Sequence, residues 1–134
     1  MKKCILLYEN WQMECCGTPF ANQDNIKWLV CNGDKIKLSV ETEKIDYLYE
    51  AHSSDYEKIW VLEGKVNKIK ALYQKYSKSS EDSNLSVPVD GVLVDINASE
   101  EIKTYIDNME FSSYIVYFEN YTIRDAEKND VTFR

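Results

Sequence analysis

The stretch Phe111-Ser112-Ser113-Tyr114-Ile115-Val116-Tyr117-Phe118-Glu119-Asn120-Tyr121-Thr122-Ile123 carries the strongest β-strand signal in the chain. Large apolar side chains alternate along it and therefore fall on both faces of an extended backbone. They are Tyr114, Val116 and Phe118 on one face, and Ile115, Tyr117, Tyr121 and Ile123 on the other. Apolar residues on both faces predict a strand that is covered on both sides.

A β-hairpin is predicted around Asn32-Gly33-Asp34. The preceding residues 27–31 are rich in β-formers, and residues 35–40 alternate strictly between polar and apolar side chains. Asn-Gly favours a tight type I′ turn, because both central positions of that turn need φ > 0. Residues 45–50 alternate again and predict a further strand, with Ile45, Tyr47 and Tyr49 on one face.

The segment 59–76 fits two kinds of secondary structure. Val66, Ile69 and Leu72 follow helical spacing, whereas Gly64 and the β-branched residues fit a bulged strand. We predict a strand from the β-rich surroundings. Residues 92–96 predict a buried strand, and residues 131–133 predict a short one that closes the chain.

A short helix is predicted near residues 98–109. Asn97 resembles a helix cap, and Glu100 three residues later completes a capping box. Ile102, Ile106 and Met109 lie at i, i+4 and i+7 and form one apolar stripe.

Together these segments predict a mainly β (α+β) fold. The expected architecture is a small antiparallel β-barrel or strongly curved sheet of about six to eight strands, with one short helix. The length of 134 residues suits a single domain, 1–134. An exposed loop is expected at 77–86, because residues 77–84 contain no apolar side chain.

The charge balance limits the possible partners. The chain has 16 basic and 23 acidic residues, which gives a formal net charge of -7. This excess of acid argues against nucleic acid and against an anionic membrane, and it is compatible with a basic protein partner. The apolar run at the start ends at Glu9, so no signal peptide is predicted. We therefore expect a cytoplasmic protein whose four cysteines are reduced.

The segment Trp11-Gln12-Met13-Glu14-Cys15-Cys16-Gly17-Thr18-Pro19-Phe20 combines two adjacent thiols, a glycine turn and flanking aromatic residues. It resembles a family of small bacterial proteins known as a domain of unknown function, with the pattern Trp-Gln-x-x-Cys-Cys-Gly-x-Pro-Phe. Similar blocks are residues 49–52 and 64–71, so the resemblance covers roughly residues 1–75. It implies one coherent domain and brings no activity, cofactor or partner.

Candidate binding residues surround this motif. Aromatic side chains on a β surface can stack on a ligand or on a partner's side chain, but they also fill cores, and both interpretations stay open. The candidates are Trp11, Gln12, Glu14, Cys15, Cys16, Phe20, Trp28 and His52.

No catalytic residue, cofactor or metal ligand set is assigned from the sequence. Adjacent Cys15 and Cys16 lack the spacing of paired zinc ligands and do not form the Cys-x-x-Cys redox motif. His52 is the only histidine, so any cysteine–histidine chemistry would have to use it. No phosphate-binding glycine loop or hydrolase motif is present.

The leading functional prediction is a non-enzymatic binding module that recognises another protein, for example an inhibitor of a basic toxin. One alternative is a thiol or metal site built on Cys15 and Cys16 with His52. Another is a small-ligand-binding β-barrel with Trp11 and Trp28 at its mouth. The oligomeric state is left open.

Overall fold

The protein is mainly β, as predicted. The computed structural model describes residues 3–34, 36, 38, 44–51, 56–78 and 86–132. The strands are β1 (Lys3–Glu9), β2 (Asn25–Asn32), β3 (Tyr47–Tyr49), β4 (Trp60–Lys78), β5 (Ser86–Ile96), β6 (Tyr105–Ile106) and β7 (Met109–Asp125). The helices are α1 (Asn10–Cys16) and α2 (Lys128–Thr132), with 3-10 turns η1 (Tyr56–Lys58) and η2 (Ser99–Glu101).

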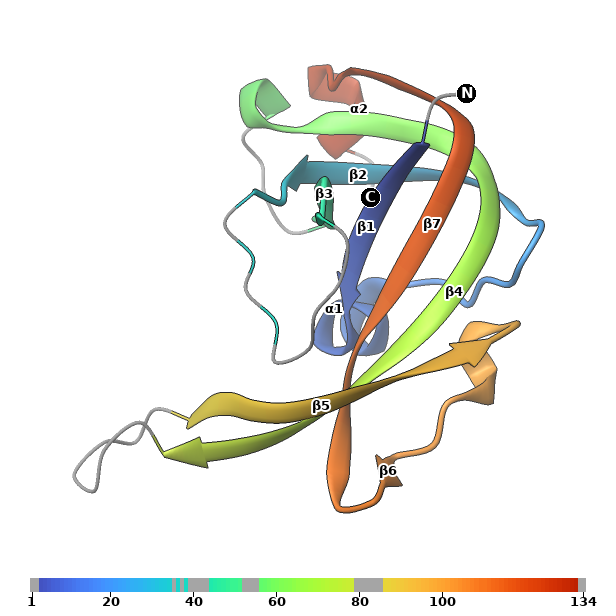
Figure 1. The fold of residues 1–134 in the computed structure, drawn as a ribbon. Coiled ribbons are helices and arrows are strands. Elements are labelled where there is room, and N and C mark those ends of the chain that lie inside the picture. The colour runs from blue at the N-terminus through green and yellow to red at the C-terminus, as the bar shows by residue number, and fades with distance from the viewer. Residues whose placement is uncertain are drawn as a thin grey trace.

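The seven strands form one strongly curved sheet in the order β5-β4-β2-β3-β1-β7-β6. An additional pairing between β4 and β7 joins β4, β2, β3, β1 and β7 into a ring of hydrogen-bonded strands. The β1–β3 pair is parallel, and the other pairs are antiparallel. Figure 1 shows β4 bending around the ring and then extending beyond it beside β5.

The ambiguous segment 59–76 is a strand, which confirms the β interpretation. All of it except Ile59 lies within the 19 residues of β4, which pair with β2, β5 and β7. Register shifts in its pairing with β7, at Glu63/Lys65 and at Val66/Lys68, accompany the bend. Gly64 suits the first of these, because a Cβ there would lie 3.0 Å from the Cβ of Tyr121, a tighter contact than most Cβ atoms make.

The strand predicted at 111–123 is also confirmed, as β7. Tyr114, Val116 and Phe118 face the main core, and Ile115 faces a second cluster. Tyr121 was expected beside Ile115 but lies in the main core. A bulge causes the difference, because Asn120 adopts a left-handed φ of 56° where β7 passes Gly64.

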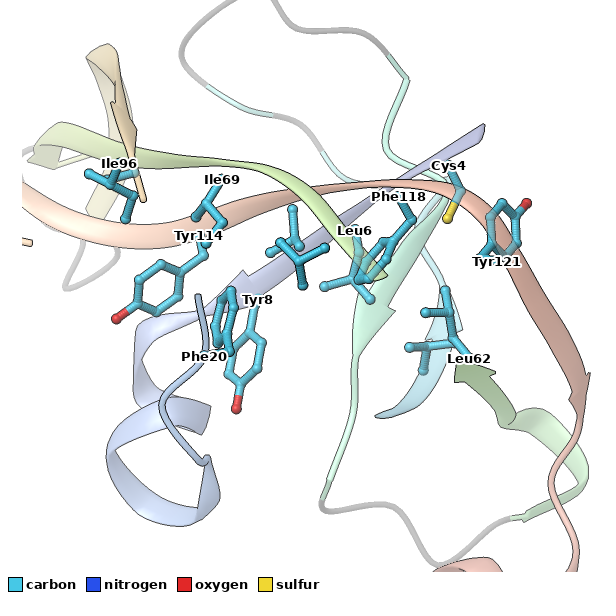
Figure 2. Close-up of a cluster of buried hydrophobic side chains, with 14 of the residues drawn as sticks. Cys4, Leu6, Tyr8, Phe20, Leu62, Ile69, Ile96, Tyr114, Phe118 and Tyr121 are labelled. Carbon is cyan, nitrogen blue, oxygen red and sulfur yellow. The ribbon is translucent and has the colours of Figure 1, made fainter. Parts of the chain in front are cut away.

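Two apolar clusters cover the two faces of β1, β4 and β7. The main core includes residues from every strand of the ring, and Figure 2 shows several of them converging between the strands: Cys4, Leu6, Tyr8, Phe20, Leu62, Ile69, Ile96, Tyr114, Phe118 and Tyr121. The second cluster lies on the opposite face and contains Ile5, Leu7, Ile45, Leu72 and Ile115. Ile36 and Leu38, from the segment between β2 and β3, pack against it.

The tight hairpin predicted at Asn32-Gly33-Asp34 is not formed. β2 does form a hairpin, but its partner is β3, and the connection spans residues 33–46. Gly33 has no positive φ; instead, a Cβ there would lie 3.0 Å from the backbone nitrogen of Tyr47. Close packing therefore explains this glycine. Of the predicted strand 35–40, only Ile36 and Leu38 are described, and neither belongs to a strand.

The helix predicted near 98–109 is wrong. This segment forms η2, then β6, and then the start of β7. Ile102, Ile106 and Met109 do pack against the core. However, Ile102 follows η2, and Ile106 and Met109 lie at the ends of β6 and β7, on either side of a two-residue turn. The turn residues Asp107 and Asn108 both have positive φ, as a type I′ hairpin requires. Spacing that suits one helical stripe thus also suits a hairpin that returns to the same surface.

Three smaller expectations also changed or stay open. Residues 128–132 form α2, so the strand predicted at 131–133 is wrong, and Phe133 lies outside the described residues. The strand at 92–96 exists, but β5 is an edge strand whose residues 92–94 are half-buried. In the predicted loop 77–86, residues 77, 78 and 86 belong to strands, and residues 79–85 lie outside the described part.

Candidate functional site: an aromatic groove along β2

The helix α1 carries the first half of the Trp-Gln-x-x-Cys-Cys-Gly-x-Pro-Phe motif and follows β1 directly. Its last turn closes where the N–H of Gly17 donates to the carbonyl of Met13 at 3.2 Å. A Cβ on Gly17 would collide with the Tyr8 hydroxyl and would lie 2.7 Å from the Met13 Cα. The glycine of the motif therefore allows α1 to pack closely on the end of β1.

Gln12 holds the chain that leaves β3. Its Nε2 donates to the carbonyl oxygen of Tyr49 at 2.7 Å, and its Oε1 accepts the N–H of Ala51 at 3.0 Å. The side chain is only 2% exposed, so both bonds are shielded from water. β1 pairs with β3 only as far as Leu48, and the Gln12 amide takes the place of a strand for the next residues. This candidate site residue thus has a structural role.

Phe20 anchors the end of the motif in the main core. Its N–H donates to the Ser99 hydroxyl at 3.0 Å, and its carbonyl accepts the N–H of Ser99 at 2.8 Å. An isolated bridge between Ala21 and Ala98 continues this pairing. In Figure 2 the Phe20 ring lies beside Tyr8, close to α1. The segment after α1 is therefore fixed at Phe20, both by backbone hydrogen bonds and by the buried side chain.

Phe20 and Trp28 meet in a cluster of aromatic rings centred on Tyr8. The Tyr8 ring stacks on Tyr49 with centroids 3.8 Å apart and an interplanar angle of 10°. Trp28 meets Tyr8 edge-to-face at 5.2 Å and Phe20 at 5.0 Å. Tyr114 also contacts both Tyr8 and Phe20. The edge-to-face contacts of Trp28 and Tyr114 are favourable geometries for aromatic pairs, whereas Tyr8 and Tyr49 stack closely face to face.

The outer edge of this cluster forms a groove. Trp28 and Tyr49 are only half-buried, and both line two adjacent hollows of about 350 and 200 Å³. The larger hollow is lined by Thr18, Pro19, Phe20, Asp24, Asn25, Ile26, Lys27, Trp28 and Tyr49. The smaller one is lined by Lys27, Trp28, Leu29, Tyr49, Ala51, Val61 and Asp130. We call the two hollows together the β2 groove.

Charged side chains lie at the rim of the β2 groove. Asp24 and Lys27 are exposed. Asp130, at the end formed by α2, accepts two hydrogen bonds from the Arg124 guanidinium at 2.9 and 3.0 Å. These bonds and the N–H of Glu127 lower the pKa of the Asp130 carboxyl to about 2. Asp130 is therefore ionised and paired with Arg124, and Lys27 also stabilises its charge. The Asp24 carboxylate accepts the N–H of Ala21 at 2.9 Å through one oxygen and is exposed to a ligand.

The tyrosines behind the groove are neutral near pH 7. Burial raises the pKa of Tyr114 to about 12, and burial likewise raises the pKa of Tyr8. The pKa of the Cys31 thiol is also raised, by burial and then by the carboxylates of Glu50 and Glu9. Raised values disfavour tyrosinate and thiolate, so these groups offer ring faces and hydrogen bonds rather than a nucleophile.

Trp11, Glu14 and Cys15 lie together on α1 and outside the described lining of the β2 groove. Trp11 lies on α1 with half of its surface exposed, and Glu14 accepts a hydrogen bond from the Asn10 amide at 3.2 Å. Cys15 is disulfide-bonded, contrary to the expectation of four reduced thiols, whereas Cys4 and Cys31 form no disulfide. The side chain of Cys16 and the whole of His52 lie outside the described residues.

Among the groove residues that were not predicted as site residues are Tyr49, Asp24 and Lys27. Tyr49 was noted only in an alternating strand and in the block 49–52. The alternation placed Tyr47 and Tyr49 on one face correctly, but Ile45, expected beside them, lies in the second cluster. Asp24 and Lys27 carry no motif, since they reach the groove only because the segment before β2 folds beside the Phe20 anchor. Proximity to Trp28 in the sequence was the one available signal.

No three His, Cys, Asp or Glu side chains in the described ranges are grouped so that they could hold a metal ion. Among the helices of the same ranges, none is long and apolar enough to cross a membrane.

A family of unknown function was expected from the sequence, and a family model matches most of the chain. Residues 2–120 match the model of a family described as a family of unknown function (DUF6578). This match runs well beyond residue 75 and includes β1 to β6 and the first part of β7. Comparisons with curated proteins and with solved structures give no match. The chain therefore belongs to this family of unknown function, DUF6578.

Proposed function

We propose that the protein is a non-enzymatic binding module that recognises a basic segment of another protein in the β2 groove. The observation that carries this proposal is the position of Trp28 and Tyr49. Each has one side packed against a fixed buried ring and another side open to both hollows. Tryptophan and tyrosine held in this way are typical of the residues that dominate protein interfaces.

The basic character of the partner follows from charge. The chain carries a net charge of -7, and the Asp24 carboxylate lies at the rim of the groove. A lysine or arginine side chain can stack on a tryptophan or tyrosine ring while it pairs with a nearby carboxylate. An acidic protein also attracts a basic partner over a longer distance, which speeds association at low salt.

Lys27 provides a sharp test, because it is the one cation that lines both hollows among the described residues. Lys27→Glu removes a repulsive charge and adds an attractive one, so we expect tighter binding of a basic partner. Lys103→Glu makes the same change in net charge at an exposed position outside the groove lining. A difference between the two variants would therefore report the groove itself and not the overall charge.

The experiment captures proteins from a host lysate on the immobilised wild type and on both variants, at low and at moderate salt. We expect a basic protein to be retained by the wild type, to be retained more strongly by Lys27→Glu, and to be released by salt. Lys103→Glu should behave like the wild type apart from a small charge effect. Retention of no basic protein at low salt, or equal changes in both variants, would contradict the proposal.

A small ligand is the second candidate for the same groove. The volume of about 350 Å³ of its larger hollow falls within the range of small-molecule sites, roughly 300–1,000 Å³. Such a ligand would stack on Trp28 and change its fluorescence, whereas Trp28→Phe would remove the change. A panel of metabolites that leaves the tryptophan emission unaltered would argue against this alternative.

A further inference from the structure

The strand β2 has one edge that the ring covers only in part. β4 pairs with residues 25–30 of β2, whereas β3, on the other side, pairs only with residues 30–32. Figure 1 shows β3 as a much shorter strand beside β2. One last bond follows this pairing, from the N–H of Glu50 to the carbonyl of Leu29 at 2.9 Å. In the part of the chain that the structure describes, residues 25–28 therefore have a neighbouring strand on one side only, and we call their other side the open edge of β2.

Two hydrogen bonds determine which backbone groups face the open edge. In an antiparallel strand, the N–H and C=O groups of successive residues point alternately to its two sides. The carbonyl of Asp24 accepts the N–H of Val66 at 2.9 Å and so faces β4, whereas the carbonyl of Leu29 faces β3. The pairing with β4 runs without a register shift between these two residues. Asn25 and Lys27 therefore turn their N–H and C=O groups away from β4, and no hydrogen bond between described residues uses these groups.

The open edge lies in the larger hollow of the β2 groove. Five consecutive residues, 24–28, line this hollow of about 350 Å³. Side chains of successive strand residues point to opposite faces, so a hollow lined by consecutive residues is bordered by the edge of the strand. Thr18, Pro19 and Phe20 line the same hollow from the segment after α1. The hollow thus lies where a further strand would continue the line of β3.

An extended peptide is the ligand that such an edge selects. A free strand edge binds a peptide through main-chain hydrogen bonds, and alternate side chains of the peptide supply the specificity. Asn25 and Lys27 together offer two N–H donors and two C=O acceptors. Ile26 and Trp28 pack against the main core, so their face of β2 is the one toward the aromatic rings, and Lys27 lies on the other face.

We propose that the partner's basic segment binds as an added β-strand, antiparallel to β2, along the open edge. This inference rests on the proposed function, which supplies the basic character of the segment. The antiparallel direction is that of β3, whose line the segment continues. Residues opposite Asn25 and Lys27 bond to β2 and point their side chains outward. Residues opposite Ile26 and Trp28 point theirs toward the aromatic rings, so the segment carries basic residues at alternate positions.

Capped peptides of alternating lysine and valine test the proposal. One form carries backbone N-methyl groups on every valine and another on every lysine, so both have the same composition and charge. With the lysine side chains inward, the valine N–H groups face β2. We expect the N-methyllysine form to bind like the unmodified peptide, and the N-methylvaline form to bind at least about tenfold more weakly, by fluorescence anisotropy at low salt. Equal affinities of the two forms, or the reverse order, would overturn the proposal.

Lys27→Pro and Lys27→Ala are a matched pair of protein variants. Both remove the same charge, but only proline removes an N–H from the open edge, and it leaves the bonds to β4 in place. Lys27→Ala should bind the unmodified peptide at least as well as the wild type, and Lys27→Pro should bind it more weakly than Lys27→Ala. Circular dichroism verifies the strand content of both variants.

Hydrogen exchange of the wild type provides the test if Lys27→Pro does not fold. Binding of the unmodified peptide should slow exchange at the amides of Asn25 and Lys27. It should change the amides of Ile26 and Trp28 much less, because these already face β4. Unchanged exchange at Asn25 and Lys27 in the presence of bound peptide would overturn the proposal.

The outcomes separate this inference from the proposed function. Equal binding of the two methylated peptides that Lys27→Glu still strengthens would keep the β2 groove as the site and reject the added strand. No binding of the unmodified peptide would overturn the inference, whereas capture from the lysate still decides the proposed function. A wild-type dimer that Lys27→Pro abolishes and Lys27→Ala retains would overturn it too, because the open edge would then bind a second copy.

Discussion

The side-chain hydroxyl of Tyr8 occupies the space that a Cβ atom on Gly17 would need. Tyr8 is the last buried residue of β1, and Gly17 is the first residue after α1. This single contact sets how closely the helix lies against the strand. It also explains why the Cys-Cys pair of the motif is followed by glycine.

Gly17→Ala should destabilise the fold by about 1–3 kcal/mol, the usual effect of forcing a methyl group into a packed site. Tyr8→Phe alone should be neutral or slightly stabilising, because the buried Tyr8 hydroxyl has no hydrogen-bond partner among the described residues. The double variant should recover part of the loss, with Met13 preventing full recovery. Urea unfolding of the four proteins completes the cycle, and strictly additive effects would show that the two residues do not compete for space.

Gln12→Met should lower the free energy of unfolding by about 2–4 kcal/mol. Methionine has a similar volume but leaves the Tyr49 carbonyl and the Ala51 N–H without their buried partner. Thermal and urea unfolding measure the change. Glu14→Ala serves as the control, since Glu14 is exposed on the same helix and should change stability by no more than about 0.5 kcal/mol. A comparable effect of both substitutions would refute the structural role of Gln12.

Alkaline conditions should unfold the protein cooperatively. The pKa of Tyr114 is raised to about 12, and the pKa values of Tyr8 and Tyr121 are also raised, in each case mainly by burial. A tyrosine with a raised folded pKa stabilises the fold fully below its unfolded pKa of about 10, and this contribution is lost as the pH rises further. Stability should therefore fall between about pH 10 and pH 12. Absorbance at alkaline pH measures the formation of tyrosinate. If tyrosinate forms before the structure is lost, burial does not protect the tyrosine rings from ionisation.

Acid should loosen α2 before the ring of strands. The folded pKa of Asp130 is lowered to about 2, chiefly by the Arg124 hydrogen bond, so its contribution is complete above the unfolded value of 3.8. That contribution is lost as the pH falls from 3.8 through 2. Hydrogen exchange of residues 128–132 should rise over this window, and Asp130→Asn should show the same rise at neutral pH. Glu100→Gln, an exposed carboxylate remote from Arg124, should leave exchange at α2 unchanged.

The elements predicted correctly are those whose signal is local. Strand β7 was predicted from its two apolar faces, and the segments of β2, β3 and β4 were predicted from their β-rich composition. The wrong prediction of a helix near 98–109 has a physical cause. The apolar spacing of Ile102, Ile106 and Met109 suits a helix and a returning hairpin equally, and only contact with the core decides between them.

The site was predicted only in part, because some of its contacts join residues that lie far apart in the sequence. The motif led to Phe20 and Trp28, which the fold does bring together. It could not show that Gln12 is buried, because the backbone groups that Gln12 binds lie nearly forty positions later. Tyr49 was likewise hidden, since its stacking on Tyr8 is set by the β1–β3 pairing. Long-range contacts of this kind leave no trace in residue spacing.

The pairing of β1 with β7 has a consequence for biosynthesis. Lys3 lies opposite Glu119, so β1 leaves the ribosome long before its antiparallel neighbour β7 has been made. Topologies dominated by such distant pairings fold slowly, and unpaired apolar strands are prone to aggregate. The apolar sequence Cys4-Ile5-Leu6-Leu7-Tyr8 is therefore without its β7 partner for much of translation.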